Sequence, residues 1–145
     1  MCKLVTPAGA AGMTDNHPTS VFYDGTSGYW SIVNTDGAAM PAFIAFNIFI
    51  PPDSRSPFTI VSSGLNIAGN TVYINDQRTH HHPEAALLVT QIKTAVSNHN
   101  IGVKYDPVQA EWGIMNEDGA AMANGMEFNV LVLTPNKVYL PLIKH

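Results

Sequence analysis

The sequence has few charged residues and no long apolar run. Only 12% of its 145 residues are Asp, Glu, Lys or Arg, and the formal charge of -4 comes from scattered acids. Lys and Arg never cluster, so the basic stripe that a phosphate backbone requires is missing and no nucleic acid partner is expected. No apolar stretch approaches the ~20 residues that cross a bilayer, so no membrane span is expected.

Cysteine is also scarce. Cys2 is the only one, which excludes an internal disulfide. The first residues, MCKLVTPAGAAGM, lack the apolar core of an export signal. Low charge with many Asn, Gly, Thr and Pro is nevertheless typical of secreted β-proteins, so we expect an extracellular or cell-surface location. With 46% hydrophobic residues, the chain is long enough to fold as a single domain, 1–145.

One stretch occurs twice. Residues 30–40 read WSIVNTDGAAM and residues 112–122 read WGIMNEDGAAM, 82 positions later, and the match extends without a gap over 21–50 and 103–132. Further back, Leu4-Val5-Thr6 resembles Leu88-Val89-Thr90 once a two-residue insertion is allowed. Self-similar units usually pack together to bury a core that neither closes alone, so we expect a pseudo-twofold domain.

The first copy is shorter than the second. Asn70-Thr71-Val72-Tyr73-Ile74 precedes the second copy, and the first has no room for it before Met1. The same pattern recurs as Asn136-Lys137-Val138-Tyr139-Leu140. We therefore predict that repeat one, residues 1–50, is completed by 133–145, that repeat two covers 59–132, and that the N- and C-terminal strands are neighbours.

Each copy has a β pattern. Polar and apolar residues alternate at 30–34 and 46–50, and Asp36-Gly37 between them favours a hairpin turn. The copy at 112–132 keeps this pattern. Since Phe49 and Leu131 are apolar on the second face, we expect their strand to be covered on both sides. Tyr-Asp turns at 23–25 and 105–107 separate this hairpin from the strand before it.

One segment is ambiguous. Residues 83–97 repeat Leu88, Ile92 and Val96 at a spacing of four, which suits a helix. We favour a strand at 86–92, because its counterpart in the first copy is followed directly by Pro7 and repeats share one local structure. The expected fold is an all-β, single-domain β-sandwich, with a closed barrel as the alternative.

A known family shows the same motifs. The patterns N-x-V-Y-I, L-L-V-T-Q, N-H-x-x-G-V-x-Y-D, W-x-I-x-N-x-D-G-A-A-M and F-N-V cover most of the chain. This set resembles a repeat domain found in many bacterial proteins, often secreted, that has no assigned activity. The resemblance implies a β-rich extracellular module without catalytic function.

Oxygen-bearing side chains recur in both copies and are candidate ligands for Ca²⁺ or for a carbohydrate. Calcium takes six to eight such oxygens. The candidates are Asp24, Asn34 and Asp36, with their counterparts Asp106, Asn116 and Asp118. The alternative, which we favour, is that these residues bond their own backbone in turns. Tyr29, absent from the second copy, is a candidate exposed ring for stacking on a sugar, whereas Trp30 and Trp112 are expected in the core.

Histidines are the remaining candidates. His80 and His82, beside Glu84, suit a transition metal, although an exposed loop that binds metal adventitiously is the more common explanation. His17 and His99 occupy matching positions and have the chemistry of general acids or bases. No nucleophile accompanies them at a recognisable spacing, so we expect them to brace loops.

These features favour a non-enzymatic, lectin-like binding module whose partner is a carbohydrate or a surface protein, bound through loops at one end of the two repeats. Two equivalent sites would increase avidity. A structural or self-assembling subunit, forming a homo-oligomer or filament through unprotected outer strands, is the alternative. A small hydrolase using His17 or His99 is a further alternative, and it requires a pocket around one of them.

Overall fold

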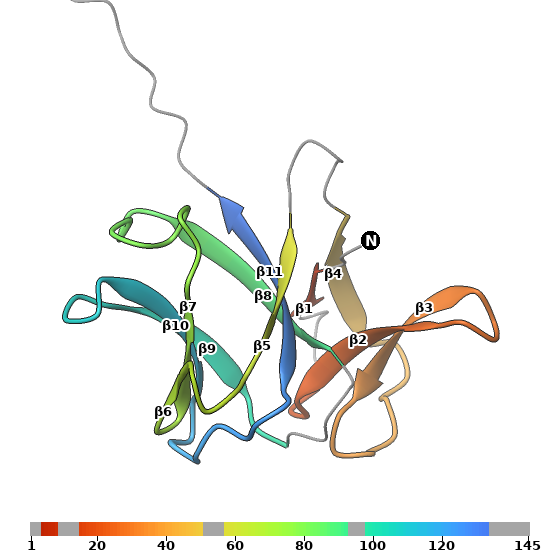
Figure 1. The fold of residues 1–145 in the computed structure, drawn as a ribbon. Helices are drawn as coiled ribbons and strands as arrows, with labels where there is room; N and C mark the ends of the chain where they lie inside the picture. Colours follow the sequence, from red (N-terminus) through yellow and green to blue (C-terminus); the bar gives the residue numbers. More distant parts are fainter. Residues whose placement is uncertain (1–3, 9–14, 51–56, 93–97, 134–145) are drawn as a thin grey trace, which may run out of the picture.

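All regular elements in the described part of the chain are strands. The computed structural model describes residues 4–8, 15–50, 57–92 and 98–133 (Figure 1). The first repeat holds β1 (Leu4–Ala8), β2 (Thr19–Asp24), β3 (Tyr29–Asn34) and β4 (Ala45–Phe49). The second repeat holds β5 (Phe58–Val61), β6 (Ile67–Ala68), β7 (Thr71–Ile74), β8 (Ala86–Ile92), β9 (Ile101–Asp106), β10 (Glu111–Asn116) and β11 (Glu127–Leu133). These segments contain no helix long and apolar enough to cross a membrane.

The strands form an open β-sandwich. Five strands pair in the order β3-β2-β8-β11-β5, four in the order β6-β7-β10-β9, and β1 pairs with β4. All contacts are antiparallel except that of β2 with β8. None of these sheets closes on itself, so the predicted sandwich is confirmed and the barrel alternative is not formed.

The core lies in the second repeat, between the four-stranded sheet and β11. Alternate residues of β7, β10 and β11 face inward and remove their side chains from water. The buried cluster consists of Val72, Ile74, Ile114, Met122, Met126, Phe128 and Val130. On the opposite face of β11, Leu131 is 1% exposed, so this strand is covered on both sides as predicted.

The two repeats share one pairing register. In β1–β4, Thr6 lies opposite Asn47, and in β8–β11, Thr90 lies opposite Asn129, so the register is kept across the two-residue insertion. The hairpins β2–β3 and β9–β10 match as well. The structure therefore pairs the residues that the sequence repeat aligns.

Aromatic contacts follow the same equivalence. The rings of Tyr23 and Trp30 lie 5.7 Å apart and those of Tyr105 and Trp112 lie 5.8 Å apart, measured between centroids. Both tryptophans are half-buried. Trp112 packs against the core cluster and donates its indole N–H to the carbonyl of His82 at 2.9 Å.

The predicted hairpin across Asp36-Gly37 is wrong. β3 pairs with β2, and β4 pairs with β1 in another sheet. Gly37 has a φ of 79°, but Asp36 does not share a positive φ, whereas a tight type I′ hairpin needs one at both central residues. The Asp36 carboxylate instead accepts the N–H of Ala38 at 2.9 Å, which turns the chain out of the sheet. The hairpins are closed by the Tyr-Asp turns after β2 and β9.

The ambiguous segment is a strand, β8, with the predicted bounds 86–92. β8 pairs with β11 along seven residues and with β2 on its other edge. This pairing satisfies its backbone and overrides the helical spacing of Leu88 and Ile92. Val96, the third residue of that spacing, lies outside the described residues.

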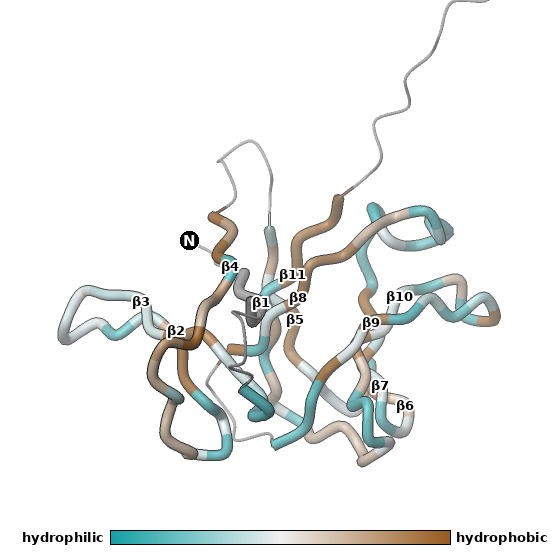
Figure 2. The backbone as a smooth tube through the Cα atoms, turned by 180° about the vertical axis from the view of Figure 1, so that it is seen from behind, coloured by the Kyte–Doolittle hydropathy of each residue, from teal (hydrophilic) through white to brown (hydrophobic). Residues whose placement is uncertain are grey.

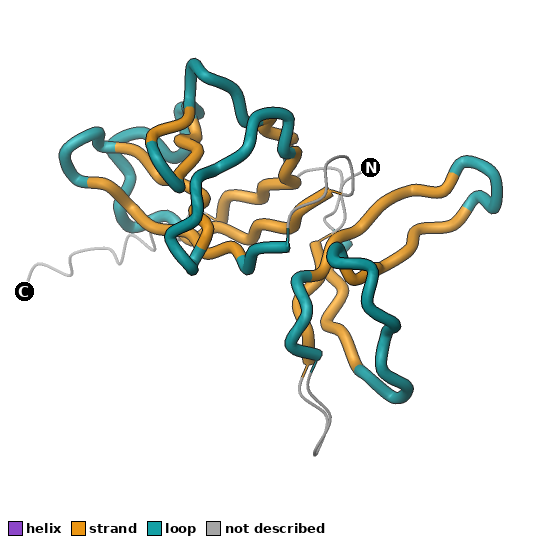
Figure 3. Tube along the Cα trace, turned by 90° about the horizontal axis from the view of Figure 1, so that it is seen from below, coloured by secondary structure: helices purple, strands orange, loops and turns teal. Residues whose placement is uncertain are grey.

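The first repeat is less complete than the second. Among the described strands, β10 lies between β7 and β9, and β11 between β5 and β8, whereas β3 and β4 each have a single partner. Ile48 of β4 is 57% exposed and Phe49 is 37% exposed, so the expected burial of this strand on both sides is wrong. Figure 3 shows the β2–β3 hairpin extending away from the second-repeat strands, and Figure 2 shows that the end of β4 is hydrophobic. Of the segment predicted to complete this repeat, 133–145, residues 134–145 lie outside the described residues.

Candidate functional site

A polar pocket of about 410 Å³ lies where the two repeats meet. This volume is within the ~300–1,000 Å³ typical of small-molecule sites. The lining residues come from the segment that leads into β2 with the first residue of β2, from the end of β8, from the segment that leads into β9 with the first residue of β9, and from the residue after β10. They are Asp15, Asn16, His17, Pro18, Thr19, Val89, Thr90, Gln91, His99, Asn100, Ile101 and Glu117.

The parallel contact between β2 and β8 creates this pocket. Ser20 lies opposite Gln91 and Val21 opposite Ile92. Parallel strands run in the same direction, so the residues that precede β2 lie beside those that precede Gln91 in β8. One wall therefore comes from repeat one and the facing wall from repeat two.

A His–Asp pair from each repeat borders the pocket. Nδ1 of His17 lies 2.5 Å from the Asp36 carboxylate, and Nδ1 of His99 lies 2.6 Å from the Asp118 carboxylate. Both imidazoles line the pocket, and both pairs join residues 19 positions apart. The prediction that His17 and His99 occupy equivalent positions is thus confirmed, and they lie at one site rather than at two.

Each carboxylate of these pairs is held by two donors. The pKa of Asp36 is lowered first by the N–H of Ala38 and then by His17, and donors of the same kinds lower the pKa of Asp118. Hydrogen bonds to a charged carboxylate favour its ionised form. Since one oxygen bonds the imidazole and the other bonds the backbone, these aspartates fix their loops, the role we favoured over calcium ligation.

Two residues that line the pocket each have a buried polar atom without a hydrogen-bond partner within the described structure. Oδ2 of Asp15 is a buried acceptor, and Nε2 of Gln91 is a buried donor. Gln91 is 2% exposed. A buried polar atom without a partner costs about 1–3 kcal/mol, so a partner for these two atoms would stabilise the site.

The hairpin-tip candidates are separated. Asp24 accepts the N–H of Thr26, and Asp106 accepts the N–H of Val108, both at 2.9 Å, so each caps its own turn. Tyr29, 73% exposed, lies opposite Asp24. Figure 1 shows the two tips on opposite sides of the molecule. The structure does not bring these residues together at one end of the repeats.

Asn34 and Asn116 lie at the ends of β3 and β10 and are both buried. Nδ2 of Asn116 donates to the carbonyls of Ala120 at 3.0 Å and Ala121 at 3.2 Å, which holds the loop that leaves the sheet. Neither asparagine lines the main pocket, and Asn116 borders a smaller one of about 250 Å³.

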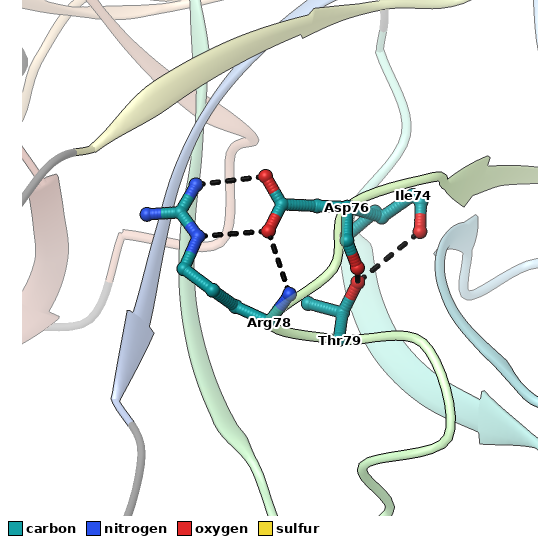
Figure 4. Close-up of polar contacts among 4 residues, drawn as sticks. All are labelled: Ile74, Asp76, Arg78 and Thr79. Atoms are coloured by element: carbon teal, nitrogen blue, oxygen red, sulfur yellow. Dashed lines mark hydrogen bonds and ion pairs between the residues drawn. The ribbon is translucent and has the colours of Figure 1, made fainter.

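The histidine loop between β7 and β8 is fixed by an ion pair. Figure 4 shows the Arg78 guanidinium against the Asp76 carboxylate, at 2.7 Å and 2.8 Å. This contact lowers the pKa of Asp76. The adjacent Thr79, fully buried, donates to the carbonyl of Ile74 or of Asp76.

Within this loop, His80 and His82 have separate carboxylate partners. His80 lies 3.5 Å from Glu111, and His82 lies 2.9 Å from Glu84. The described residues contain no group of three or more His, Cys, Asp or Glu side chains placed to hold a metal ion. Their assignment as metal ligands stays a prediction.

Sequence reasoning singled out His17 and His99 but missed the other polar residues that line the pocket. Thr90 and Gln91 are polar residues inside an otherwise apolar strand, which is a signal that a side chain serves more than packing. Asp15 and Glu117 carry no such signal, because they join the site only through the contact between repeats.

Comparison with known proteins identifies a family and no activity. Neither a curated protein nor a solved structure matches this chain. Residues 20–132 match a family described as a domain of unknown function, and this range contains both His–Asp carboxylates and most of the pocket. Since the match covers most of the sequence, the chain belongs to the family of domains of unknown function named DUF7452.

Proposed function

We propose that the chain is a carbohydrate-binding module whose ligand occupies the pocket between the repeats. The observation that carries this proposal is the pair of buried, unpartnered atoms, Oδ2 of Asp15 and Nε2 of Gln91, in the pocket wall. Sugar hydroxyls both donate and accept hydrogen bonds, so a saccharide offers the donor that Asp15 lacks and the acceptor that Gln91 lacks.

The charge of the lining favours a neutral ligand. Asp15 and Glu117 are acidic, and the described lining residues include no Lys or Arg. A phosphate or carboxylate would face repulsion from these acids without a fixed cation to compensate. A hydroxyl-rich neutral molecule avoids this repulsion and uses the same oxygens as acceptors.

The lining also offers an apolar surface. Pro18, Val89 and Ile101 lie among the polar residues. Small-molecule sites combine apolar contact area with a few polar groups that fix orientation. The C–H face of a sugar ring would contact the apolar residues while its hydroxyls reach Thr90 and Gln91.

A glycan array probed with labelled protein tests the proposal, with and without chelator. We expect binding to a subset of neutral saccharides that Gln91→Leu abolishes, because leucine keeps the volume and removes the donor. Tyr29→Ala, at the distant hairpin tip, is the matched control and should bind normally. Binding lost in Tyr29→Ala and kept in Gln91→Leu would move the site to the loops, and no binding by the native chain would refute a carbohydrate ligand.

A second candidate function is hydrolysis, since the required pocket around His17 or His99 exists and contains both. An imidazole held through Nδ1 by a carboxylate is the arrangement of a general base. No Ser or Cys lies among the described lining residues, so the attacking group would be water.

Turnover of chromogenic glycosides and esters distinguishes this function from binding. An enzyme should lose turnover in His17→Asn or His99→Asn while its substrate still binds. Absence of turnover in the native chain, on saccharides that it binds, would leave binding as the function.

A further inference from the structure

The outer edge of β3 has no pairing strand among the described residues. β3 pairs only with β2 among the described strands, and its sequence, YWSIVN, contains no charged residue and no proline. Natural proteins usually block such edges with lysine, proline or a covering segment. An edge without these features can pair with a strand of another molecule.

In the second repeat, the edge equivalent to the free edge of β3 is covered by a strand. Its equivalent strand, β10, is covered by β7, which runs antiparallel to it. Ile114 of β10 lies opposite Val72 of β7 and is 0% exposed. Ile32, the equivalent of Ile114, remains half-buried. Among the described residues, the first repeat therefore has no strand equivalent to β7.

The chain contains one segment with the pattern of β7. Asn136-Lys137-Val138-Tyr139-Leu140 matches Asn70-Thr71-Val72-Tyr73-Ile74, and it lies outside the described residues. Placing it on β3 as β7 lies on β10 gives a definite register. Leu140 would lie opposite Trp30, Tyr139 opposite Ser31, Val138 opposite Ile32 and Lys137 opposite Val33.

Residues 136–140 follow Leu133 too closely to reach β3 of the same molecule. β3 is three strand positions from β11 in the sheet order, so a strand added to its free edge would lie four positions away, ~19 Å sideways. In addition, Leu133 lies opposite Ala86 at the start of β8, whereas β2 meets β8 at Gln91 and Ile92, ~17 Å further along. The four residues from Leu133 to Lys137 reach at most ~14 Å.

We propose that residues 136–140 of one molecule pair with β3 of a second copy of this chain, so that the protein assembles by strand exchange. The added strand supplies backbone hydrogen bonds to the open edge, and Val138 covers Ile32. Two molecules that exchange strands reciprocally form a closed dimer. The assembly does not depend on the pocket or its ligand.

Removal of the segment tests the proposal. The full chain should have at least twice the mass of one chain by light scattering at micromolar concentration, and a chain ending at Thr134 should have the mass of one. Val138→Asp should act like the truncation, because it places a charge opposite Ile32. Lys144→Ala, beyond the paired stretch, is the control and should leave the mass unchanged.

A cross-linking experiment decides which molecule supplies the strand. In a Cys2→Ser background, one chain carries Ser31→Cys and another carries Tyr139→Cys. Mixing them under mild oxidation should give a covalent dimer containing one of each, since directly opposite residues on paired strands are within disulfide range.

Three results would overturn the proposal. They are a full chain that is monomeric at all concentrations, an assembly that survives the truncation, and a chain carrying both cysteines that cross-links within one molecule. Circular dichroism of the truncated chain shows that a lower mass does not reflect unfolding.

Discussion

Asn34 and Asn116 occupy the same position in the two repeats, and only Asn116 has hydrogen-bond partners for its side chain within the described structure. Nδ2 of Asn116 donates to two carbonyls of the following loop. The side-chain nitrogen and oxygen of Asn34 are both buried without a partner there. The same asparagine at equivalent positions should therefore contribute differently to the stability of the two repeats.

Replacing these asparagines with alanine should show this inequality. Asn116→Ala removes two hydrogen bonds and leaves the carbonyls of Ala120 and Ala121 unpaired, which should lower the free energy of unfolding by about 1–3 kcal/mol. Asn34→Ala removes two buried polar atoms that have no partner there, so it should leave the free energy of unfolding unchanged or raise it. Urea denaturation of the chain ending at Thr134 measures both without a contribution from assembly. Equal losses would show that the repeats are equally complete.

A second matched pair tests where the core lies. Val130 is 0% exposed and its equivalent Ile48 is 57% exposed. Val130→Ala should lower the free energy of unfolding by roughly 2–3 kcal/mol, because it removes buried methyl groups and leaves a cavity. Ile48→Ala should change the free energy of unfolding by less than ~0.5 kcal/mol, since the side chain is already exposed to water. A large loss for Ile48→Ala in dilute protein would mean that β4 is covered in solution.

Gly113 is required by close packing rather than by its backbone angles. A Cβ at this position would lie 2.4 Å from Cγ2 of Thr71, which is 2% exposed. Gly113→Ala should therefore destabilise the fold by about 1–3 kcal/mol. Thr71→Ser removes the opposing methyl and should recover part of that loss in the double variant. Additive losses of unfolding free energy for the two substitutions would argue against this contact. As a control, Ser31, the equivalent of Gly113, should tolerate alanine.

The His99–Asp118 pair predicts a loss of stability in acid. Because folding lowers the pKa of Asp118 below its ordinary value of 3.8, its contribution is complete above that pH and disappears as the pH falls through the lower, folded value. In Asp118→Asn this contribution is absent. The difference in unfolding free energy between the native chain and the variant should be constant from pH 5 to 7 and shrink below ~pH 4. A difference that stayed constant down to pH 2 would mean that the carboxylate is not held by these donors.

Local and repeated features of the structure were predictable from the sequence, and contacts between the repeats were not. Alternation defined the strands, and the comparison with the segment before Pro7 identified β8 correctly as a strand. Asp36-Gly37 led to a wrong prediction of strand pairing, because two residues suited to a hairpin also suit a turn that leaves the sheet. The parallel contact of Ser20 with Gln91 has no local signature, so the pocket that it creates could not be anticipated.

Titration calorimetry of the chain with the saccharide that binds best on the array tests the central claim most directly. A pocket built jointly by Asp15 of one repeat and Gln91 of the other predicts one ligand per chain, and no heat of binding in Gln91→Leu. Two ligands per chain, bound normally by Gln91→Leu and lost in part in Tyr29→Ala, would contradict it and place separate sites on the two hairpin tips.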